Sequence, residues 1–179
     1  MWNAAAAATM KKERTMQLVR SLKITPEEFF DAIETSVLYD IEQSTGKRPK
    51  RDKLNGFKYE KVEKGSGKDA GKPIKVRICA YRFPSLYEVR FKYSTGANTM
   101  RYEVEPDEDG NCLLVYTETY KASIKNEGFW GKVNTFIYER RIRSRARKTI
   151  DQIASYAIKH RRTESNPLIE ELESEEKAD

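Results

Sequence analysis

Few residues of this chain have the type and spacing that acid–base or nucleophilic catalysis requires. The only histidine, His160, lies between the cations Lys159 and Arg161, and no local pattern pairs it with a serine or cysteine nucleophile. Two cysteines, Cys79 and Cys112, together with one histidine do not supply the ligands of a zinc site. We therefore expect a solvent-exposed His160, and no catalytic residue, metal or cofactor.

Two carboxylates, Glu103 and Glu105, are spaced to share one face of a strand, as a catalytic acid–base pair would. Arg101 shares that face, and the residues between the three are apolar. This alternation favours a charged, water-facing sheet surface over an active site.

The glycine-rich loop at residues 64–73 invites comparison with phosphate-binding loops. A P-loop has four residues between its glycines and then a helix, whereas five residues separate Gly65 from Gly71 and a strand-like run follows. The spacing of Gly65, Gly67 and Gly71 also misses the dinucleotide fingerprint by one residue. We interpret this segment as a flexible hairpin connection.

Two helices are predicted around these residues. Residues 129–162 contain no proline, carry apolar residues at helical spacing and predict a helix of about 50 Å. Earlier in the chain, Thr25, Pro26 and Glu28 form the N-cap, N1 proline and capping box of a second helix, which Gly46 ends.

The remaining segments alternate as strands at residues 17–24, 57–63, 74–81, 87–93, 100–105 and 112–120. Short connections between the later strands indicate an antiparallel meander. The element order is strand, helix, about five strands and a long helix. This order predicts an α+β domain in which the sheet wraps one face of the long helix.

Charge is distributed unevenly along the 179 residues, whose net charge is +6. Residues 132–162 carry ten Lys or Arg against two acids, a balance of +8, and residues 163–179 carry seven acids against one lysine, a balance of −6. We predict a single domain at 16–162, an acidic disordered tail at 163–179, and a disordered extension or cloning scar at 1–15.

The cysteine content and the lack of recognisable targeting signals indicate the cellular compartment in which we expect the protein. Two cysteines in strand-like runs favour a reduced, cytoplasmic setting, although a bridge between neighbouring strands stays open. The apolar opening of the chain lacks a basic n-region, and no run is long enough to span a membrane. We expect no integral membrane association.

Three stretches resemble a known family: ITPEEFFDAI, FPSLYEVRFKYSTGANTMRYEVEPDEDG and FWGKVNTFIYERR. Together they are similar to a Gram-positive bacterial family, domain of unknown function 3284, within the START-like, helix-grip (SRPBCC) superfamily. The resemblance covers roughly residues 16–160 and leaves out both ends of the chain. It implies a curved sheet gripping the C-terminal helix, with a cavity that superfamily members use for lipids, hormones, aromatic polyketides or partner proteins. It carries over no catalytic motif.

The first functional hypothesis is a non-catalytic binding protein for a small hydrophobic or aromatic ligand in that cavity. Tyrosines on the inward face of a sheet can give an apolar pocket a few polar groups, although a plainly packed core remains the alternative. The candidate cavity residues are Ile78, Tyr87, Phe91, Tyr93, Met100, Tyr102, Val133 and Ile137.

The alternative hypothesis is a module that binds a polyanion (nucleic acid or anionic membrane) or a protein partner through the long helix, modulated by the acidic tail. A broad basic face is the expected footprint of such binding, but a solvated outer face partly neutralised by the tail would look the same. The basic face comprises Arg140, Arg141, Arg143, Arg145, Arg147 and Lys148.

Overall fold

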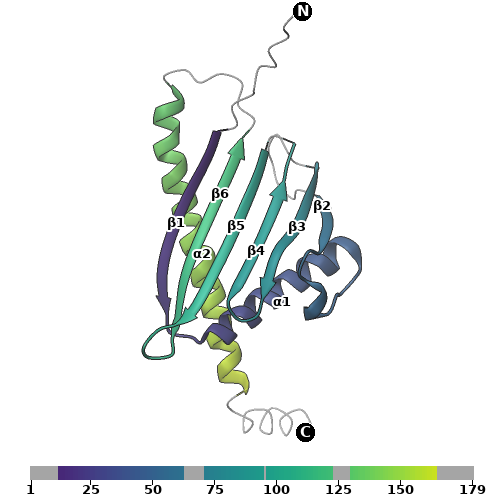
Figure 1. The fold of residues 1–179 in the computed structure, drawn as a ribbon, viewed down its shortest axis with the longest axis vertical. Coiled ribbons are helices and arrows are strands. Elements are labelled where there is room, and N and C mark those ends of the chain that lie inside the picture. Colours follow the sequence, from purple (N-terminus) through teal and green to yellow (C-terminus); the bar gives the residue numbers. More distant parts are fainter. Residues whose placement is uncertain (1–11, 63–70, 95, 123–129, 165–179) are drawn as a thin grey trace, which may run out of the picture.

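The computed structural model describes residues 12–62, 71–94, 96–122 and 130–164; for residues 12, 122, 130–139 and 162–164 it describes the backbone alone. Six strands form one antiparallel sheet in the order β1-β6-β5-β4-β3-β2 (Figure 1). The elements are β1 (Lys12–Leu22), α1 (Pro26–Thr45), a short 3-10 helix (Arg51–Lys53), β2 (Lys58–Val62), β3 (Pro73–Arg82), β4 (Leu86–Lys92), β5 (Gly96–Pro106), β6 (Cys112–Ala122) and α2 (Trp130–Glu164).

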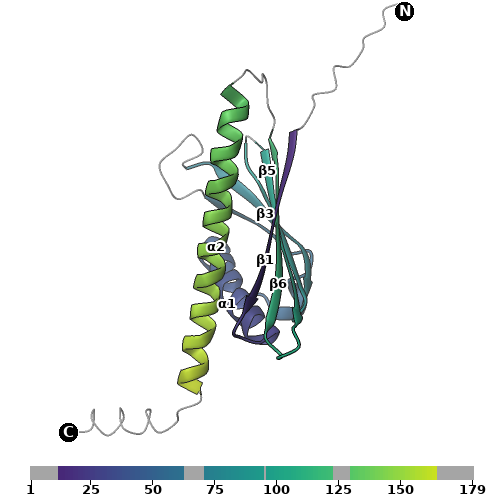
Figure 2. The ribbon, with the colours of Figure 1, turned by 90° about the vertical axis from the view of Figure 1, so that its left-hand side faces the viewer.

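Both helices lie on the same face of the sheet, which we call the inner face (Figure 2). The long helix α2 passes behind β1 and β6 in Figure 1, and α1 crosses behind the lower ends of the other strands. The predicted α+β architecture, with a sheet wrapped on a long C-terminal helix, is confirmed.

Helix α1 begins and ends where the sequence predicts. The Thr25 hydroxyl accepts a hydrogen bond from the Glu28 amide at 3.2 Å, and the Glu28 carboxylate accepts one from the Thr25 amide at 2.6 Å. This capping box satisfies two amides that the helix itself leaves unpaired. Gly46 ends the helix in the left-handed region, at φ 68°, which glycine adopts without strain.

The first strand begins earlier than predicted. Residues 12–15 pair with residues 119–122 of β6, and the Lys121 ammonium lies 2.9 Å from the Glu13 carboxylate. The predicted boundary at residue 16 is therefore wrong for residues 12–15. Because these residues are polar, they lack the apolar alternation that predicts a strand. They form one at the sheet edge by pairing with β6. The predicted tail at 163–179 begins inside α2, which continues through residues 163 and 164. Residues 1–11 and 165–179 lie outside the described residues.

The core lies between the inner face and the helices. Phe29 and Phe30 of α1 and Ile150 of α2 are fully buried, and Ala146 and Ala157 extend the buried stripe of α2. Small residues let α2 approach its neighbours closely, and the large α1 aromatics fill the space beside Tyr81 and Tyr102 of the sheet.

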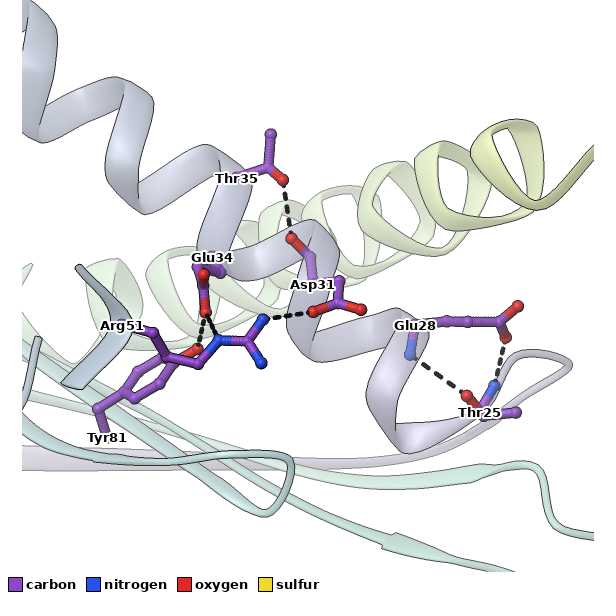
Figure 3. A network of polar contacts seen from close by, with 7 residues as sticks. All are labelled: Thr25, Glu28, Asp31, Glu34, Thr35, Arg51 and Tyr81. Carbon is purple, nitrogen blue, oxygen red and sulfur yellow. Dashed lines mark hydrogen bonds and ion pairs between the residues drawn. The ribbon is translucent and has the colours of Figure 1, made fainter. Parts of the chain in front are cut away.

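A polar network fastens the segment after α1 to the rest of the domain (Figure 3). The Arg51 guanidinium contacts the carboxylates of Glu34 at 2.5 Å and Asp31 at 2.7 Å, and the Tyr81 hydroxyl donates to Glu34 at 2.5 Å. Arg51 also lies 4.0 Å from the ring centroid of Phe83. The short 3-10 helix after α1 thus holds α1 and β3 together.

Ile150→Asp should destabilise the domain by about 3–5 kcal/mol, because it places an unpaired charge where the parent side chain is fully buried. Chemical denaturation would measure the change. Ser144→Asp, at an exposed position of the same helix, is the control and should unfold within about 0.5 kcal/mol of the parent. Equal midpoints for Ile150→Asp and the parent would contradict the packing of α2.

The contact between the Glu28 carboxylate and the Arg161 guanidinium ties the start of α1 to the last turns of α2. This hydrogen bond, with that of the Thr25 amide, lowers the pKa of Glu28 below its ordinary value despite partial burial. A lowered folded-state pKa gives stability that is present above the unfolded pKa and lost as pH falls through the folded pKa.

Glu28→Gln should therefore reduce the loss of folding stability at acidic pH. From about pH 5 downward, the parent should lose more stability than the variant, while at pH 7 the variant should be the less stable. Thermal unfolding at pH 7 and pH 3 would measure both differences. Glu27→Gln, in the same helical turn and exposed, is the control; parallel pH profiles for parent and Glu28→Gln would refute this role.

Candidate functional site: a cavity between the two helices and the sheet

An open cavity of about 670 Å³ lies between α1, the second half of α2 and the inner face of β2, β4 and β5. Its wall combines apolar, aromatic and a few polar side chains. The lining residues are Ala32, Ile33, Thr35, Ser36, Val37, Tyr39, Asp40, Tyr59, Lys61, Tyr87, Val89, Phe91, Met100, Tyr102, Thr149, Gln152, Ile153 and Tyr156.

The cavity exists because α2 packs chiefly on α1 and β1. Figure 2 shows the long helix standing off from the sheet along its length. The inner face of β4 and β5 is therefore covered jointly by two helices that diverge, and their side chains do not fill the space between them.

Strand alternation forms the floor of the cavity. Tyr87, Val89 and Phe91 of β4 point inward, with Met100 and Tyr102 of β5 at directly opposed positions to Val89 and Tyr87. The rings of Tyr87 and Tyr102 stack at 5.9 Å between centroids. The result is an aromatic floor beneath α1 and α2.

A charged cluster lies at the side of the cavity formed by β2. The Asp40 carboxylate of α1 accepts hydrogen bonds from the Tyr59 hydroxyl at 2.5 Å and from the Lys61 ammonium at 2.8 Å. The Lys61 ammonium also lies 5.3 Å from the ring centroid of Phe91. Burial, and then the Asp40 hydrogen bond, raise the pKa of Tyr59, so this phenol stays protonated and donates.

The Tyr87 hydroxyl is the polar group of the floor that has no fixed partner. In the described part of the chain it makes no hydrogen bond, although the residue is buried. Burial raises the pKa of Tyr87 well above its ordinary value, so the hydroxyl remains neutral and can both donate and accept. Among the described residues, the Asn98 carbonyl oxygen is the one enclosed side-chain polar atom without a partner, so the Tyr87 hydroxyl is within reach of water or of a ligand in the cavity.

Of the eight predicted cavity residues, Tyr87, Phe91, Met100 and Tyr102 line this cavity. Ile78 is fully buried in the core and does not line it. Tyr93 lines a different hollow, described below. The side chains of Val133 and Ile137, in the first half of α2, lie outside the described residues.

Sequence reasoning missed the contribution of the helices to this wall. Ala32, Ser36 and Asp40 recur every four residues on α1, beside the apolar stripe, and the last two place polar groups at its border. That polar border was the available signal. On α2, Thr149, Gln152 and Tyr156 carry no pattern that separates a cavity wall from a solvated surface.

A second polar cluster is buried on β5 and β6. The Glu118 side chain is 2% exposed and accepts hydrogen bonds from Asn98 at 2.7 Å, Tyr116 at 2.8 Å and Arg145 at 2.9 Å. The Asn98 carbonyl oxygen has no partner among the described residues. A buried carboxylate is costly without a counter-charge, and Arg145 of α2 supplies that counter-charge to Glu118.

Arg145, a member of the predicted basic face, thus has a second contact inside the domain. Its side chain is 61% exposed, yet its guanidinium reaches the buried Glu118, which no sequence pattern had paired with it. The other members of the basic face are exposed: Arg140, Arg141, Arg143, Arg147 and Lys148.

The remaining sequence candidates lie apart from both clusters. His160 is exposed and its ring lies 4.0 Å from that of Tyr156. Arg101 pairs with Glu103 and Glu88, at 2.8 Å each, on the outer face of the sheet. Cys79 and Cys112 are free thiols. No group of three or more metal-ligating side chains occurs within the described residues.

The fold and the cavity together define a helix-grip protein of the START-like type. A family model, "Domain of unknown function (DUF3284)", matches residues 16–139, and the chain belongs to that family. No curated protein matches the chain. Neither described helix is apolar enough over a sufficient length to span a bilayer.

Solved structures share the fold at low sequence identity. A protein of unknown function, SA2116 from Staphylococcus aureus, is 13% identical with a TM-score of 0.62, covering 86% of this chain and 98% of its own. Norcoclaurine synthase from Thalictrum flavum, solved with dopamine and hydroxybenzaldehyde, is 10% identical with a TM-score of 0.54, covering 84% of this chain and 89% of its own. Mll3558 from Rhizobium loti is 12% identical with a TM-score of 0.53, covering 82% and 98%.

Arg145→Gln should destabilise the domain by about 1.5–3 kcal/mol, the range for hydrogen bonds to charged groups, because it leaves the Glu118 carboxylate without its cation. Arg141→Gln, an exposed neighbour, should change stability by less than about 0.5 kcal/mol. Chemical denaturation would measure both variants. A double-mutant cycle, with Glu118→Gln, Arg145→Gln and the variant carrying both changes, would give the coupling energy between the two side chains. A coupling energy near zero would show that the contact is not a stabilising one.

Proposed function

We propose that this protein binds a small, mainly apolar ligand carrying an aromatic ring, in the cavity between α1, α2 and the sheet, and that it does so without catalysing a reaction. The observation that carries the proposal is the cavity itself, with its aromatic floor and the Tyr87 hydroxyl, which makes no hydrogen bond within the described part of the chain. Its volume of about 670 Å³ lies within the range of ligand pockets.

The lining favours an apolar ligand. Val37, Val89, Phe91, Met100 and Ile153 offer surface from which water is readily displaced, at about 25 cal/mol per Å² of apolar area buried. A planar ring could lie along the stacked tyrosines of the floor, since aromatic pairs gain about 0.5–1.5 kcal/mol beyond the area they bury. Norcoclaurine synthase, a relative in fold, has been solved with two aromatic compounds.

The polar groups favour one hydrogen-bonding substituent on the ligand. The Tyr87 hydroxyl can orient such a group from the floor, while Asp40, Tyr59 and Lys61 already satisfy one another. The same pairing argues for binding rather than catalysis, because the Lys61 side chain is engaged by the Asp40 carboxylate at 2.8 Å and is not presented to a ligand as a nucleophile.

The alternative partner, a polyanion or a protein bound through the basic face of α2, has less support. All six of its cations are exposed, but Arg145 is also engaged with Glu118. We keep it as an outcome that the experiments below would reveal through their controls.

Met100→Trp should fill the cavity and weaken binding of the neutral fluorescent probe N-phenyl-1-naphthylamine by at least about tenfold, equivalent to 1.4 kcal/mol. Thr99→Trp is the matched control, because the next residue of β5 points to the outer face and should leave binding unchanged. Fluorescence titration measures both. Equal probe affinity for the two variants would refute the cavity as the binding site.

Tyr87→Phe should abolish the preference for 2-naphthol over naphthalene, because the hydroxyl that can bond the naphthol is gone; a loss of about three- to tenfold for 2-naphthol alone corresponds to one hydrogen bond. Competition against the fluorescent probe measures both compounds. Stability should not fall, since no hydrogen bond of the protein is removed. Tyr39→Phe, at an exposed position of the cavity margin, is the control. An unchanged preference in Tyr87→Phe would exclude this orienting role.

A further inference from the structure

A second hollow, of about 690 Å³, lies on the outer face of the sheet, the face turned away from both helices. We call it the outer hollow. Much of its lining comes from the ends of β3 and β4 that lie uppermost in Figure 1. Its side chains are strongly basic; the cations that line it are Lys58, Lys75, Arg77, Arg90, Lys92 and Lys121, and Glu60 is the carboxylate that the described chain places among them.

The register places like charges directly opposite one another in this hollow. Arg77 of β3 pairs with Arg90 of β4, and Lys75 pairs with Lys92. Directly opposed residues of an antiparallel pair have Cβ atoms about 5 Å apart, and like charges there are destabilising. Packing does not require these cations, because all four side chains are exposed to solvent.

The same sheet neutralises its charges elsewhere. Lower on the outer face, Arg101 of β5 lies opposite Glu88 of β4 and contacts both Glu88 and Glu103 at 2.8 Å. In the outer hollow, Lys75 lies 3.5 Å from Glu60, and Lys121 pairs with Glu13.

Four cations of the outer hollow are left without such partners. Lys58, Arg77, Arg90 and Lys92 form no ion pair with any residue in the part of the chain that is described. Positive charge is thus concentrated here, and the mutual repulsion of these side chains lowers the stability of the sheet. A bound anion would relieve that repulsion.

We propose that the outer hollow binds a compact chain of linked phosphates, either inorganic polyphosphate or the phosphate tail of a nucleotide. The unpaired cations cover three adjacent strands, about 10 Å across, and two positions along β4, about 7 Å apart. An area of that size suits two or three linked phosphates. Arg77 and Arg90 can each bond phosphate oxygens in bidentate fashion.

The group of unpaired cations does not continue onto β5, and this argues against a long nucleic acid as the ligand. The outer-face positions of β5 next to the cluster are Ala97 and Thr99, which are uncharged, and Lys121 beyond them is paired. A long polyanion would need basic positions that continue across the sheet. The outer hollow and the inner cavity lie on opposite faces of the sheet, so this proposal does not depend on the proposed function.

Isothermal titration of the full chain with sodium tripolyphosphate at 50 mM salt tests the proposal. We expect saturable binding of one tripolyphosphate per chain, weakened by at least about tenfold in Arg77→Gln/Arg90→Gln. Arg140→Gln/Arg143→Gln, which removes the same charge from exposed positions of α2, should bind within about twofold of the parent. Titration with ATP separates the two sources, since a tighter ATP complex assigns the nucleotide tail and a tighter tripolyphosphate complex assigns the inorganic chain.

Three results would overturn the proposal: no saturable binding of either compound, orthophosphate binding as tightly as tripolyphosphate, or an equal loss in both double variants. A thermal melt guards against misfolding. Arg77→Gln/Arg90→Gln should melt at or above the parent temperature at low salt, because a cross-strand repulsion is removed. Added tripolyphosphate should raise the melting temperature of the parent and of Arg140→Gln/Arg143→Gln, but not that of Arg77→Gln/Arg90→Gln.

Discussion

The architecture depends on where α2 finds its support. The buried stripe of Ile142, Ala146, Ile150 and Ala157 packs chiefly on α1 and β1 rather than on the middle of the sheet. A single helix about 10 Å wide cannot cover six strands spaced about 4.8 Å apart. The short helix α1 must cover the remaining strands, and the inner cavity is the space left where the two helices diverge over β4 and β5.

Ion pairs complete the attachment of α2 at its sides. Arg20 of β1 lies 2.9 Å from Asp151, Arg145 reaches Glu118 on β6, and Arg161 contacts Glu28 on α1. Exposed pairs such as Arg20 with Asp151 contribute little to stability. The Arg145 contact differs, because it compensates a carboxylate that the sheet has buried among Asn98 and Tyr116. The long helix is therefore held by burial along one stripe, and its orientation over the sheet is fixed by specific charges.

The sequence predicted the parts of this fold that local rules control. The capping box at Thr25 and Glu28, the glycine that ends α1, and the inward alternation of Tyr87, Phe91 and Tyr102 follow from nearest-neighbour stereochemistry. The early start of β1 could not be predicted, because its first residues are polar and become a strand only by pairing with β6. Edge strands of this kind depend on their partner more than on their own composition.

The site was harder to predict because it is made by contacts distant in sequence. The inward face of β4 and β5 could be assigned from alternation, but not whether α1 or α2 side chains would fill the space above it. The pairing of Arg145 with Glu118 joins residues 27 positions apart on different elements. Through it, one arginine of the predicted basic face contacts a buried side chain. Register across β3 and β4 likewise decides that Arg77 faces Arg90, a fact invisible to a one-dimensional pattern.

The central claim is that the space beneath α1 and α2 is open to a small aromatic molecule. Methyl-labelled methionine provides a direct test, because Met100 lines the cavity while Met16 is buried in the core away from it. Two-dimensional ¹H–¹³C spectra recorded during titration with 2-naphthol should show a saturable shift of the Met100 methyl resonance and no comparable shift of Met16. Identical small shifts of both resonances, or none, at saturating 2-naphthol would contradict an open cavity at this position.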